Sequence, residues 1–269
     1  MPESTFIADA NFTKYVGVLR DFPWSLGDTF DLAYFTPWDR TTLFQDLAME
    51  QPVTADGQSV RVMLDTSGNG YHWVAPSDAV RPVYRSTSGQ PRLEFANSGL
   101  SMAAAGLGLF SGVKYGMFCM ALSLDSINTF RSILRFNTPS NDPLFVLRTQ
   151  ASAASIEHTA RRLTGEAVVT AALGRGTGVN VWSGILDWAA GSVELHRGGE
   201  IAGNTASGMT PGSTSGTAAA AAGLGHYEAT GYAAMSFYGG ILLAGDTDPD
   251  PYRSQIEQLL ATRSGAPLS

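Results

Sequence analysis

Tyr115-Gly116-Met117-Phe118-Cys119-Met120-Ala121-Leu122 is the stretch that decides the fold class. It is a short and continuous apolar run, typical of a buried strand, and we expect the strand to extend from 115 to 124. Further short runs, apolar or alternating, lie at 130–136, 144–149, 156–163, 167–173, 179–188, 193–196 and 233–244. In 130–136 the alternation is partial, with Phe130, Leu134 and Phe136 on one face and Arg131 and Arg135 on the other. Clusters of Gly, Asn, Asp, Ser and Pro separate the runs. This rhythm predicts an all-β antiparallel sandwich.

Three further segments have recognisable local signals. Gly198-Gly199 suits a two-residue turn with positive φ, so 193–202 should be a hairpin. The Gly-, Ser- and Thr-rich stretch 202–217 predicts a long exposed loop. A short C-terminal helix over 252–261 should start at Asp250 as N-cap, with Pro251 in its first position. Its apolar stripe consists of Tyr252, Ile256, Leu259 and Leu260, and Gly265 can close it.

Composition limits the functional classes. Of 269 residues, 44% are hydrophobic and 15% charged, so the chain can bury a large core. A net charge of −7 argues against nucleic acid or an anionic membrane as a partner. No stretch is long enough for membrane insertion, and the sequence starts without a secretory signal, so we expect synthesis in a cytoplasm. The single cysteine, Cys119, excludes an intrachain disulfide and should be buried.

Part of the sequence resembles bacteriophage and prophage virion proteins. The residues that carry the resemblance are Leu43-Phe44-Gln45-Asp46, Pro52-Val53-Thr54-Ala55-Asp56-Gly57, Met63-Leu64-Asp65-Thr66-Ser67-Gly68-Asn69-Gly70-Tyr71-His72 and Arg81-Pro82. In those proteins the pattern precedes a concanavalin A-like (laminin-G-like) jelly roll. Later segments follow the same order: Arg92-Leu93-Glu94-Phe95 for the entering strand, 181–201 for the central hairpin, 235–245 for the last strand and 253–265 for the closing helix.

The resemblance covers residues 31–269 and implies a concanavalin A-like jelly-roll β-sandwich. It also implies a virion part, namely a capsid decoration, tail or fibre component, made in a host bacterial cytoplasm. The partners would be other virion proteins, further copies of the chain and host surface polysaccharide. One departure is Ala96-Asn97-Ser98-Gly99, which replaces an Asp-Gly-rich turn and puts any ligand contact by that turn in doubt.

Residues 1–30 fall outside the resemblance and should form an N-terminal arm. Phe12, Tyr15, Val16 and Leu19 recur at helical spacing, and Phe22, Trp24 and Phe30 add more apolar surface. A free tail would not expose so many apolar side chains to water. The arm should therefore dock on a neighbouring subunit or another virion protein, or else pack on its own sandwich.

The sequence lacks common catalytic patterns. No Glu-x-Asp-x-Glu occurs, although some glycan hydrolases with related folds place their carboxylates on one strand face in that way. There is also no Gly-x-Ser-x-Gly elbow, and His72, His158, His196 and His226 stand apart. We therefore expect a binding or assembly protein and not an enzyme.

Two acidic segments resemble calcium loops. Asp246, Asp248 and Asp250 alternate, but Pro251 stands where a calcium loop needs glycine, which favours a helix start. Asp65, Ser67 and Asn69 lack a closing glutamate and favour an Asx turn. No cofactor is expected, with calcium as the weaker alternative.

Aromatic side chains are the candidate glycan contacts, because sugar C–H faces pack on indole rings. The tryptophans that could supply a sugar-stacking platform are Trp38, Trp73, Trp182 and Trp188. Of these, Trp182 and Trp188 should belong to the core. Trp73, with His72 beside it after a Gly-rich turn, should be exposed and is the candidate glycan site. The leading hypothesis is a virion structural protein with a lectin-like domain. The alternatives are a free-standing carbohydrate-binding lectin and a glycan-degrading enzyme.

Overall fold

The computed structural model describes residues 26–87, 89–125, 131–137, 143–150, 155–161, 169–174, 178–201, 206–207, 209, 211–212, 219–226 and 231–268. The strands are β1 (Asp31–Phe35), β2 (Leu43–Phe44), β3 (Val62–Met63), β4 (Trp73–Val74), β5 (Val83–Arg85), β6 (Arg92–Phe95), β7 (Leu100–Met102), β8 (Tyr115–Leu124), β9 (Arg131–Asn137), β10 (Pro143–Gln150), β11 (Ser155–Ala160), β12 (Val169–Gly174), β13 (Asn180–Asp187), β14 (Ser192–Arg197), β15 (Glu200–Ile201), β16 (Ala206–Ser207), β17 (Ala221–Leu224) and β18 (Met235–Gly245). Short 3-10 turns are η3 (Arg40–Thr42), η4 (Asp78–Val80) and η5 (Ala104–Gly108), and the C-terminal helix is α1 (Asp250–Ser264).

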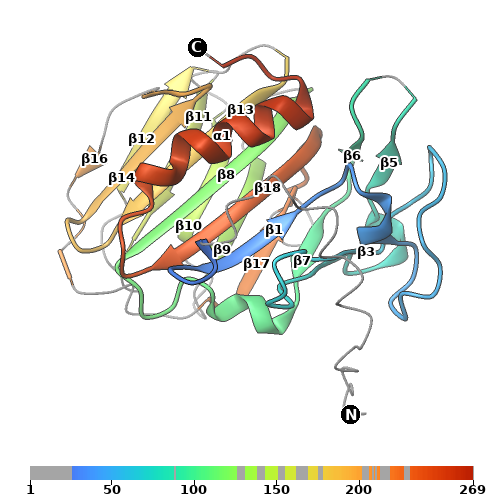
Figure 1. Ribbon diagram of the computed structural model, residues 1–269, viewed down its shortest axis with the longest axis horizontal. Helices are drawn as coiled ribbons and strands as arrows, with labels where there is room; N and C mark the ends of the chain where they lie inside the picture. Colours follow the sequence, from blue (N-terminus) through green and yellow to red (C-terminus); the bar gives the residue numbers. More distant parts are fainter. Residues whose placement is uncertain are drawn as a thin grey trace.

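These strands form two antiparallel sheets that pack face to face, as the sequence rhythm predicted (Figure 1). Sheet A has the order β15-β14-β13-β8-β18-β6-β5, with β1 also paired to β18 and β16 to β14. Sheet B has the order β12-β11-β10-β9-β17-β7-β4-β3-β2. The chain is therefore an all-β jelly-roll sandwich with one C-terminal helix, in agreement with the expected fold class.

Strand β8 shows how alternation builds two cores. Phe118, Met120 and Leu122 point between the sheets, into the main core. Met117 and Cys119 point to the opposite face of sheet A, into a second cluster under α1. Both faces of this strand are buried, which explains its continuous apolar sequence. Cys119 is buried as predicted, and desolvation raises the pKa of its thiol well above the usual value.

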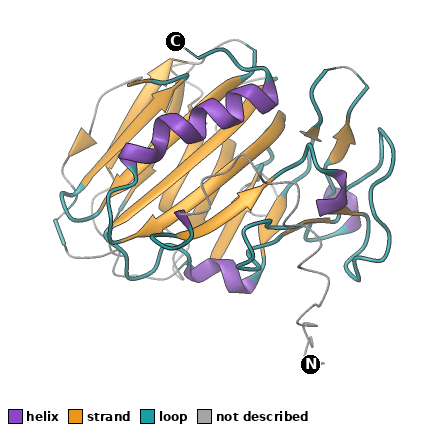
Figure 2. Ribbon diagram, in the orientation of Figure 1, coloured by secondary structure: helices purple, strands orange, loops and turns teal. Residues whose placement is uncertain are grey.

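Helix α1 lies across the outer face of sheet A, over β8, β13 and β18 (Figure 2). Ile256 and Leu260 are buried against the sheet, and Gly265 ends the helix at φ +73°, as predicted. The predicted N-cap was wrong: Pro249 occupies that position and Asp250 lies in the first turn. The carboxylate of Asp250 instead accepts a hydrogen bond from Nε of Arg253 at 2.8 Å.

The Gly-Gly hairpin is confirmed. Gly198 and Gly199 have φ of +62° and +96°, and they join β14 to β15. The exposed loop predicted for 202–217 needs correction in its described part. Ala206–Ser207 forms strand β16 against β14, and Met209 is buried, with its N–H donating to the carbonyl of Gly191 at 3.2 Å. The sheet thus extends into this segment because its backbone finds an open edge at β14.

The predicted arm is described only at its end. Leu26 and Phe30 are buried in the cluster under α1, where the ring of Phe30 meets that of Tyr252 at 5.6 Å. Strand β1 then pairs with β18. These contacts place residues 26–30 on the chain's own sandwich. Phe12, Tyr15, Val16 and Leu19 lie outside the described residues.

Among the described residues, no helix combines the length and apolar character needed to cross a membrane.

Candidate functional site

Trp73 does not form an exposed sugar platform. Its side chain is 1% exposed and lies in the core between the sheets, with its ring centre 5.8 Å from that of Phe35. Strand β4 pairs on both sides, with β3 and β7, so the Gly-rich turn before it does not leave the indole outside. The predicted exposure was wrong. Trp182 and Trp188 are buried as expected, whereas Trp38 is half-buried between Tyr34 and Arg263.

The turn before Trp73 is held by Asp65. This buried carboxylate accepts hydrogen bonds from the backbone N–H groups of Tyr34, Ser67 and Tyr71 at 2.9, 2.9 and 3.1 Å, and from the Ser67 hydroxyl at 2.7 Å. The predicted Asx turn is therefore present. His72 belongs to the same structure, because its Nδ1 accepts the N–H of Asp65 at 3.0 Å, and burial lowers the pKa of the imidazole. Asp65 and His72 join β1 to the turn.

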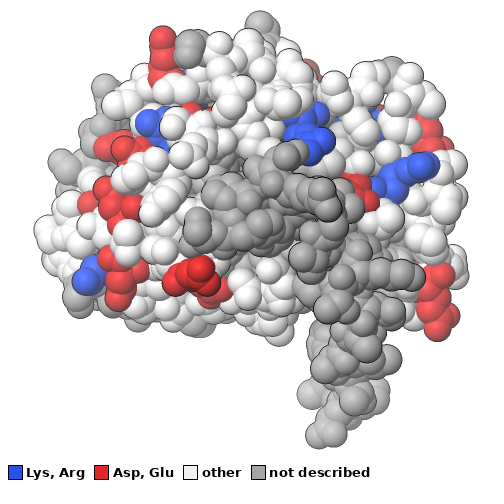
Figure 3. Space-filling view, in the orientation of Figure 1, with Lys and Arg blue, Asp and Glu red and all other residues white. Residues whose placement is uncertain are grey.

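The carboxylates of Asp246, Asp248 and Asp250 each accept a hydrogen bond from a different donor. Asp246 binds the N–H of Lys114 at 3.2 Å, and Asp248 binds the N–H of Asp250 at 3.0 Å. Within the described part of the chain, no group of three or more His, Cys, Asp or Glu side chains is arranged to hold a metal ion. The face seen in Figure 3 carries its acidic and basic side chains in small separate groups.

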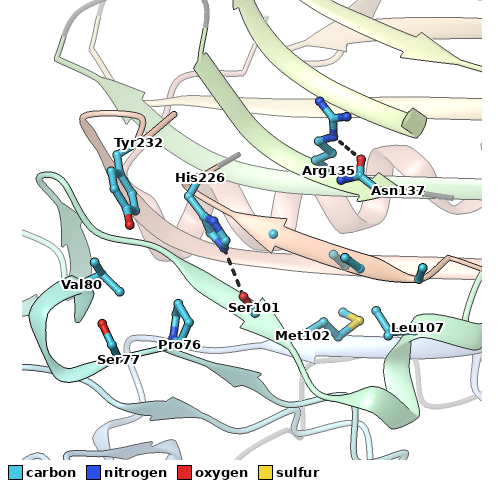
Figure 4. Close-up of a pocket in the computed structure, with 14 residues that line it drawn as sticks. Pro76, Ser77, Val80, Ser101, Met102, Leu107, Arg135, Asn137, His226 and Tyr232 are labelled. Carbon is cyan, nitrogen blue, oxygen red and sulfur yellow. Dashed lines mark hydrogen bonds between the residues drawn. The ribbon is translucent and has the colours of Figure 1, made fainter. Parts of the chain in front are cut away.

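A cavity of about 550 Å³ lies on the outer face of sheet B. Its described lining comes from β7, β9, β17 and the segments beside them: Pro76, Ser77, Val80, Ser101, Met102, Leu107, Arg135, Asn137, Ala220, Ala221, Ala222, Gly223, His226 and Tyr232 (Figure 4). The opposite outer face, on sheet A, is covered by α1. The cavity is our candidate binding site.

One row of residues across three strands organises the polar side of this cavity. Gly223 of β17 pairs with Ser101 of β7 on one side and with Arg135 of β9 on the other. Adjacent strands are about 5 Å apart, so Ser101 and Arg135 stand roughly 10 Å from each other. Gly223, which has no side chain, lies between them. The side chains of Ser101 and Arg135 point away from the core, because their neighbours Leu100 and Leu134 point into it. Leu224 also points into the core, and a β-carbon at Gly223 would meet His226 on the outer face. The alternation predicted for 130–136 is thus confirmed for Leu134 and Arg135.

The next row adds Asn137, which pairs with Ala221. The Nε–H of Arg135 donates to Oδ1 of Asn137, and this bond orients the guanidinium. Arg135 is only 7% exposed although it lines the cavity. A cation held in this way is already ordered before a ligand arrives, which lowers the entropic cost of binding.

His226 follows β17 and turns back over it. Its Nε2 lies 3.3 Å from the Ser101 hydroxyl and 3.1 Å from the carbonyl oxygen of Leu100. Two glycines create the space for the ring: a β-carbon at Gly99 would stand 2.4 Å from Cδ2, and one at Gly223 would stand 3.1 Å from Nε2. The ring of Tyr232 lies 6.1 Å from that of His226, so two aromatic rings border one side of the cavity.

The remaining described wall is mostly apolar. Met102, Leu107 and Val80 border the cavity together with Pro76, while Ser77 adds a hydroxyl. A cavity with apolar walls and a few convergent polar groups is the usual form of a small-ligand site. It can pack against the C–H surface of a ligand while Ser101, Arg135 and Asn137 bind its polar groups.

The sequence did not point to this site. Ser101, Arg135 and His226 come from segments far apart in the chain, and antiparallel pairing of β7, β9 and β17 brings them together. A usable signal was the outward position of Arg135 in an alternating strand. A second was Gly99, within the turn where the resemblance to the virion family breaks down.

No protein-family model matches the chain, and a comparison with curated proteins finds no significant match. Among solved structures, the receptor-binding domain of botulinum neurotoxin mosaic serotype C/D is similar with a TM-score of 0.56 and 9% identity, over 88% of this chain and 52% of that one. The serotype D binding domain has a TM-score of 0.54 and 8% identity, over 89% and 53%. The chain thus spans about half the length of these proteins.

A looser similarity is to the CBM40 domain of the Ruminococcus gnavus IT-sialidase bound to α2,3-sialyllactose, with a TM-score of 0.39 and 20% identity over 54% of this chain and 83% of that one. At such identities these comparisons concern the fold alone. The two neurotoxin domains agree with the two-sheet β-sandwich described above.

Proposed function

We propose that this chain is a phage-derived virion component whose sandwich binds a host surface glycan in the cavity on sheet B. The observation that carries the binding half of the proposal is the row of Ser101, Gly223 and Arg135 beside His226 and Tyr232. The virion half rests on the sequence resemblance over residues 31–269.

The cavity suits a sugar ring for two physical reasons. Sugars present hydroxyl groups at their edge, and Ser101, Asn137 and Arg135 offer hydrogen-bond partners within two rows of the sheet. Sugars also present C–H surfaces, which pack favourably on aromatic rings such as Tyr232 and on apolar side chains such as Met102.

We favour binding over hydrolysis. Most glycoside hydrolases place a pair of carboxylates beside the scissile bond. The described residues that line the cavity contribute hydroxyl, amide, imidazole and guanidinium groups and no such pair. Glu94, on the other sheet, is held in an ion pair with Arg85 at 2.6 Å.

A glycan array followed by calorimetry tests the binding half. Tyr232→Ala should weaken binding of an array hit about tenfold or more, because it removes a ring from the cavity wall; this corresponds to roughly 1.4 kcal/mol. Tyr115→Ala, which removes a tyrosine from β8 in sheet A, is the matched control and should bind normally. Circular dichroism must show both variants folded. An array without a hit, or equal losses in both variants, would refute a glycan site in this cavity.

The alternative is a free-standing carbohydrate-binding lectin. Mass spectrometry of purified particles, with antibody labelling in electron microscopy, separates the two. A stoichiometric subunit located on the particle supports the virion role. Secreted or cytosolic protein that is missing from particles would favour the free lectin, while leaving the cavity as its site.

A further inference from the structure

The His226 ring determines which way the Ser101 hydroxyl can donate. Nε2 of His226 lies 3.1 Å from the carbonyl oxygen of Leu100 and 3.3 Å from Oγ of Ser101. A carbonyl oxygen only accepts hydrogen bonds, so Nε2 must carry a hydrogen, in the neutral imidazole and in the protonated one alike. Nε2 therefore cannot accept from Ser101, and the Ser101 oxygen is the acceptor in this contact.

The hydrogen of the Ser101 hydroxyl is consequently left for a ligand. Within the described part of the chain, Nε2 of His226 is the partner of this hydroxyl, and it offers only a donor. Ser101 is half-buried and borders the cavity. A hydroxyl group rotates to suit its partner, so its hydrogen can turn into the cavity. Ser101 thus presents a donor that requires an acceptor atom on the ligand.

The surroundings of this donor are apolar. The N–H of Gly99, two residues before Ser101, donates to the carbonyl of Val80 at 3.0 Å, which places Val80 beside the start of β7. Val80, Pro76 and Met102 line the cavity, and Figure 4 shows them on the same side of it as Ser101. A ligand group that fits here combines an acceptor oxygen with a small apolar part. A plain sugar hydroxyl offers the oxygen but leaves the apolar wall in contact with water.

An acetyl group has this combination, because its carbonyl oxygen accepts hydrogen bonds and its methyl group is apolar. We infer that the cavity binds an acetylated sugar, with the acetyl oxygen accepting from the Ser101 hydroxyl and the methyl group packed against Val80, Pro76 and Met102. The inference rests on the proposed function, since it names the sugar class of the same cavity. Ser101 is then the specificity-determining residue, and His226 is a positioning residue that acts through it.

The first test uses two neutral oligosaccharides that differ at this group. The β-1,4-linked tetramers of N-acetylglucosamine and of glucose share a backbone, but the first has an acetamido group where the second has a hydroxyl. Calorimetry should show that the acetylated tetramer binds about tenfold or more tightly, because it gains one hydrogen bond and buries one methyl group.

A second pair distinguishes the acetamido group from an acetyl ester. An O-acetylated polysaccharide is measured before and after mild alkali, which removes its acetyl groups and leaves the sugar backbone. A preference in the first pair assigns the acetamido group as the ligand group. A preference in the second pair alone assigns the ester.

Variants connect the preference to Ser101. Ser101→Ala removes the donor, so affinity for the acetylated tetramer should fall about fivefold, while affinity for the glucose tetramer stays nearly unchanged. Ser123→Ala removes another half-buried strand serine, on β8 of sheet A, and is the matched control that should keep the preference. Circular dichroism checks that both variants are folded.

The position of the ring hydrogen is measured on the wild-type protein and needs no variant. Nitrogen-15 NMR distinguishes the two ring nitrogens of a histidine, and His226 should carry a hydrogen on Nε2 in the free protein. A neutral imidazole with its hydrogen on Nδ1 would overturn the inference, because Nε2 could then accept from Ser101 and no donor would be left for a ligand.

The remaining outcomes are distinct. Equal binding within both sugar pairs, or a preference that survives Ser101→Ala, would overturn the acetyl assignment while the glycan site stands. If neither pair binds, the glycan array decides: hits without acetyl groups overturn the assignment, whereas acetylated hits that bind more tightly than their hydroxyl counterparts support it. A blank array would mean that the proposed function itself fails.

Discussion

The imidazole of His226 lies over Gly223, with Nε2 only 3.1 Å from the point where a β-carbon of that residue would stand. Gly99, which immediately precedes β7, approaches the same ring. A β-carbon at Gly99 would come within 2.4 Å of Cδ2 of His226. The two glycines therefore set the position of the ring at the edge of the cavity.

Gly99→Ala should move His226 and weaken ligand binding. The added methyl group must displace the ring, which breaks the contact with Ser101, and overpacking of this kind costs about 1–3 kcal/mol. Calorimetry and chemical denaturation measure the two effects. Gly108→Ala is the matched control, since a β-carbon there meets nothing within 4 Å. An unchanged affinity in Gly99→Ala would show that the ring position does not matter for the ligand.

Stability should fall as the pH is lowered from about 6.5 towards 4 because of His158. Burial lowers the pKa of His158 to about 4, while its Nδ1 contacts the carbonyl oxygen of Glu194 at 2.9 Å. The folded state holds the imidazole neutral, so protons bind preferentially to the unfolded chain, and the loss reaches roughly 3 kcal/mol at the low end of this range. Burial also lowers the pKa of His196, which adds in the same direction.

Denaturation curves at several pH values can isolate the His158 contribution. His158→Asn retains a hydrogen-bonding group near Nδ1 but does not titrate, so its stability should depend less steeply on pH between 6.5 and 4. Parallel curves for the variant and the wild type would show that His158 does not titrate in this way.

Asp65→Ala should destabilise the sandwich by about 3 kcal/mol or more. The substitution leaves three backbone N–H groups, those of Tyr34, Ser67 and Tyr71, without their acceptor in a buried place. Asp65→Asn keeps one acceptor oxygen and should cost less. Urea denaturation gives both values, and equal losses for Ala and Asn would argue against the hydrogen bonds as the cause.

Glu257→Ala should loosen α1 and cost about 2–3 kcal/mol, because it removes a buried carboxylate and the hydrogen bonds that this group accepts, while Arg253 keeps Asp250 as its remaining ionic partner. The Glu257 carboxylate accepts from Arg253 at 3.2 Å and from the hydroxyl of Ser183 on β13, so it joins the helix to sheet A. Leu259→Ala, also on α1 and only partly buried, is the comparison and should cost less. Hydrogen exchange over 250–264 should speed up selectively in Glu257→Ala; unchanged protection would refute the role of Glu257.

The sandwich could be predicted from the sequence because its strands carry their own signals. The expected strands at 115–124 and 233–244 appear as β8 and β18, and their continuous apolar runs reflect burial on both faces. The Gly198-Gly199 turn and the Gly265 helix end also depend on local backbone chemistry. Such features need no knowledge of distant contacts.

The binding cavity could not be predicted in the same way. Whether an aromatic ring is exposed depends on which strands flank it. The turn before Trp73 is hydrogen-bonded to the buried carboxylate of Asp65, and the indole is buried. The meeting of Ser101 with Arg135 depends on β17, which enters sheet B between β7 and β9 from more than eighty residues further along the chain. Only the pairing order of the sheet reveals this neighbourhood.

The helix α1 makes the two outer faces of the sandwich different from each other. It closes the outer face of sheet A, while the cavity opens on sheet B, on the opposite side. Copies that were attached to a common surface through their helix side would all turn their cavities outward. A polymer with many repeats could then engage several of them at once, and such multivalency can raise the apparent affinity about 10²–10⁴-fold over that of one weak site.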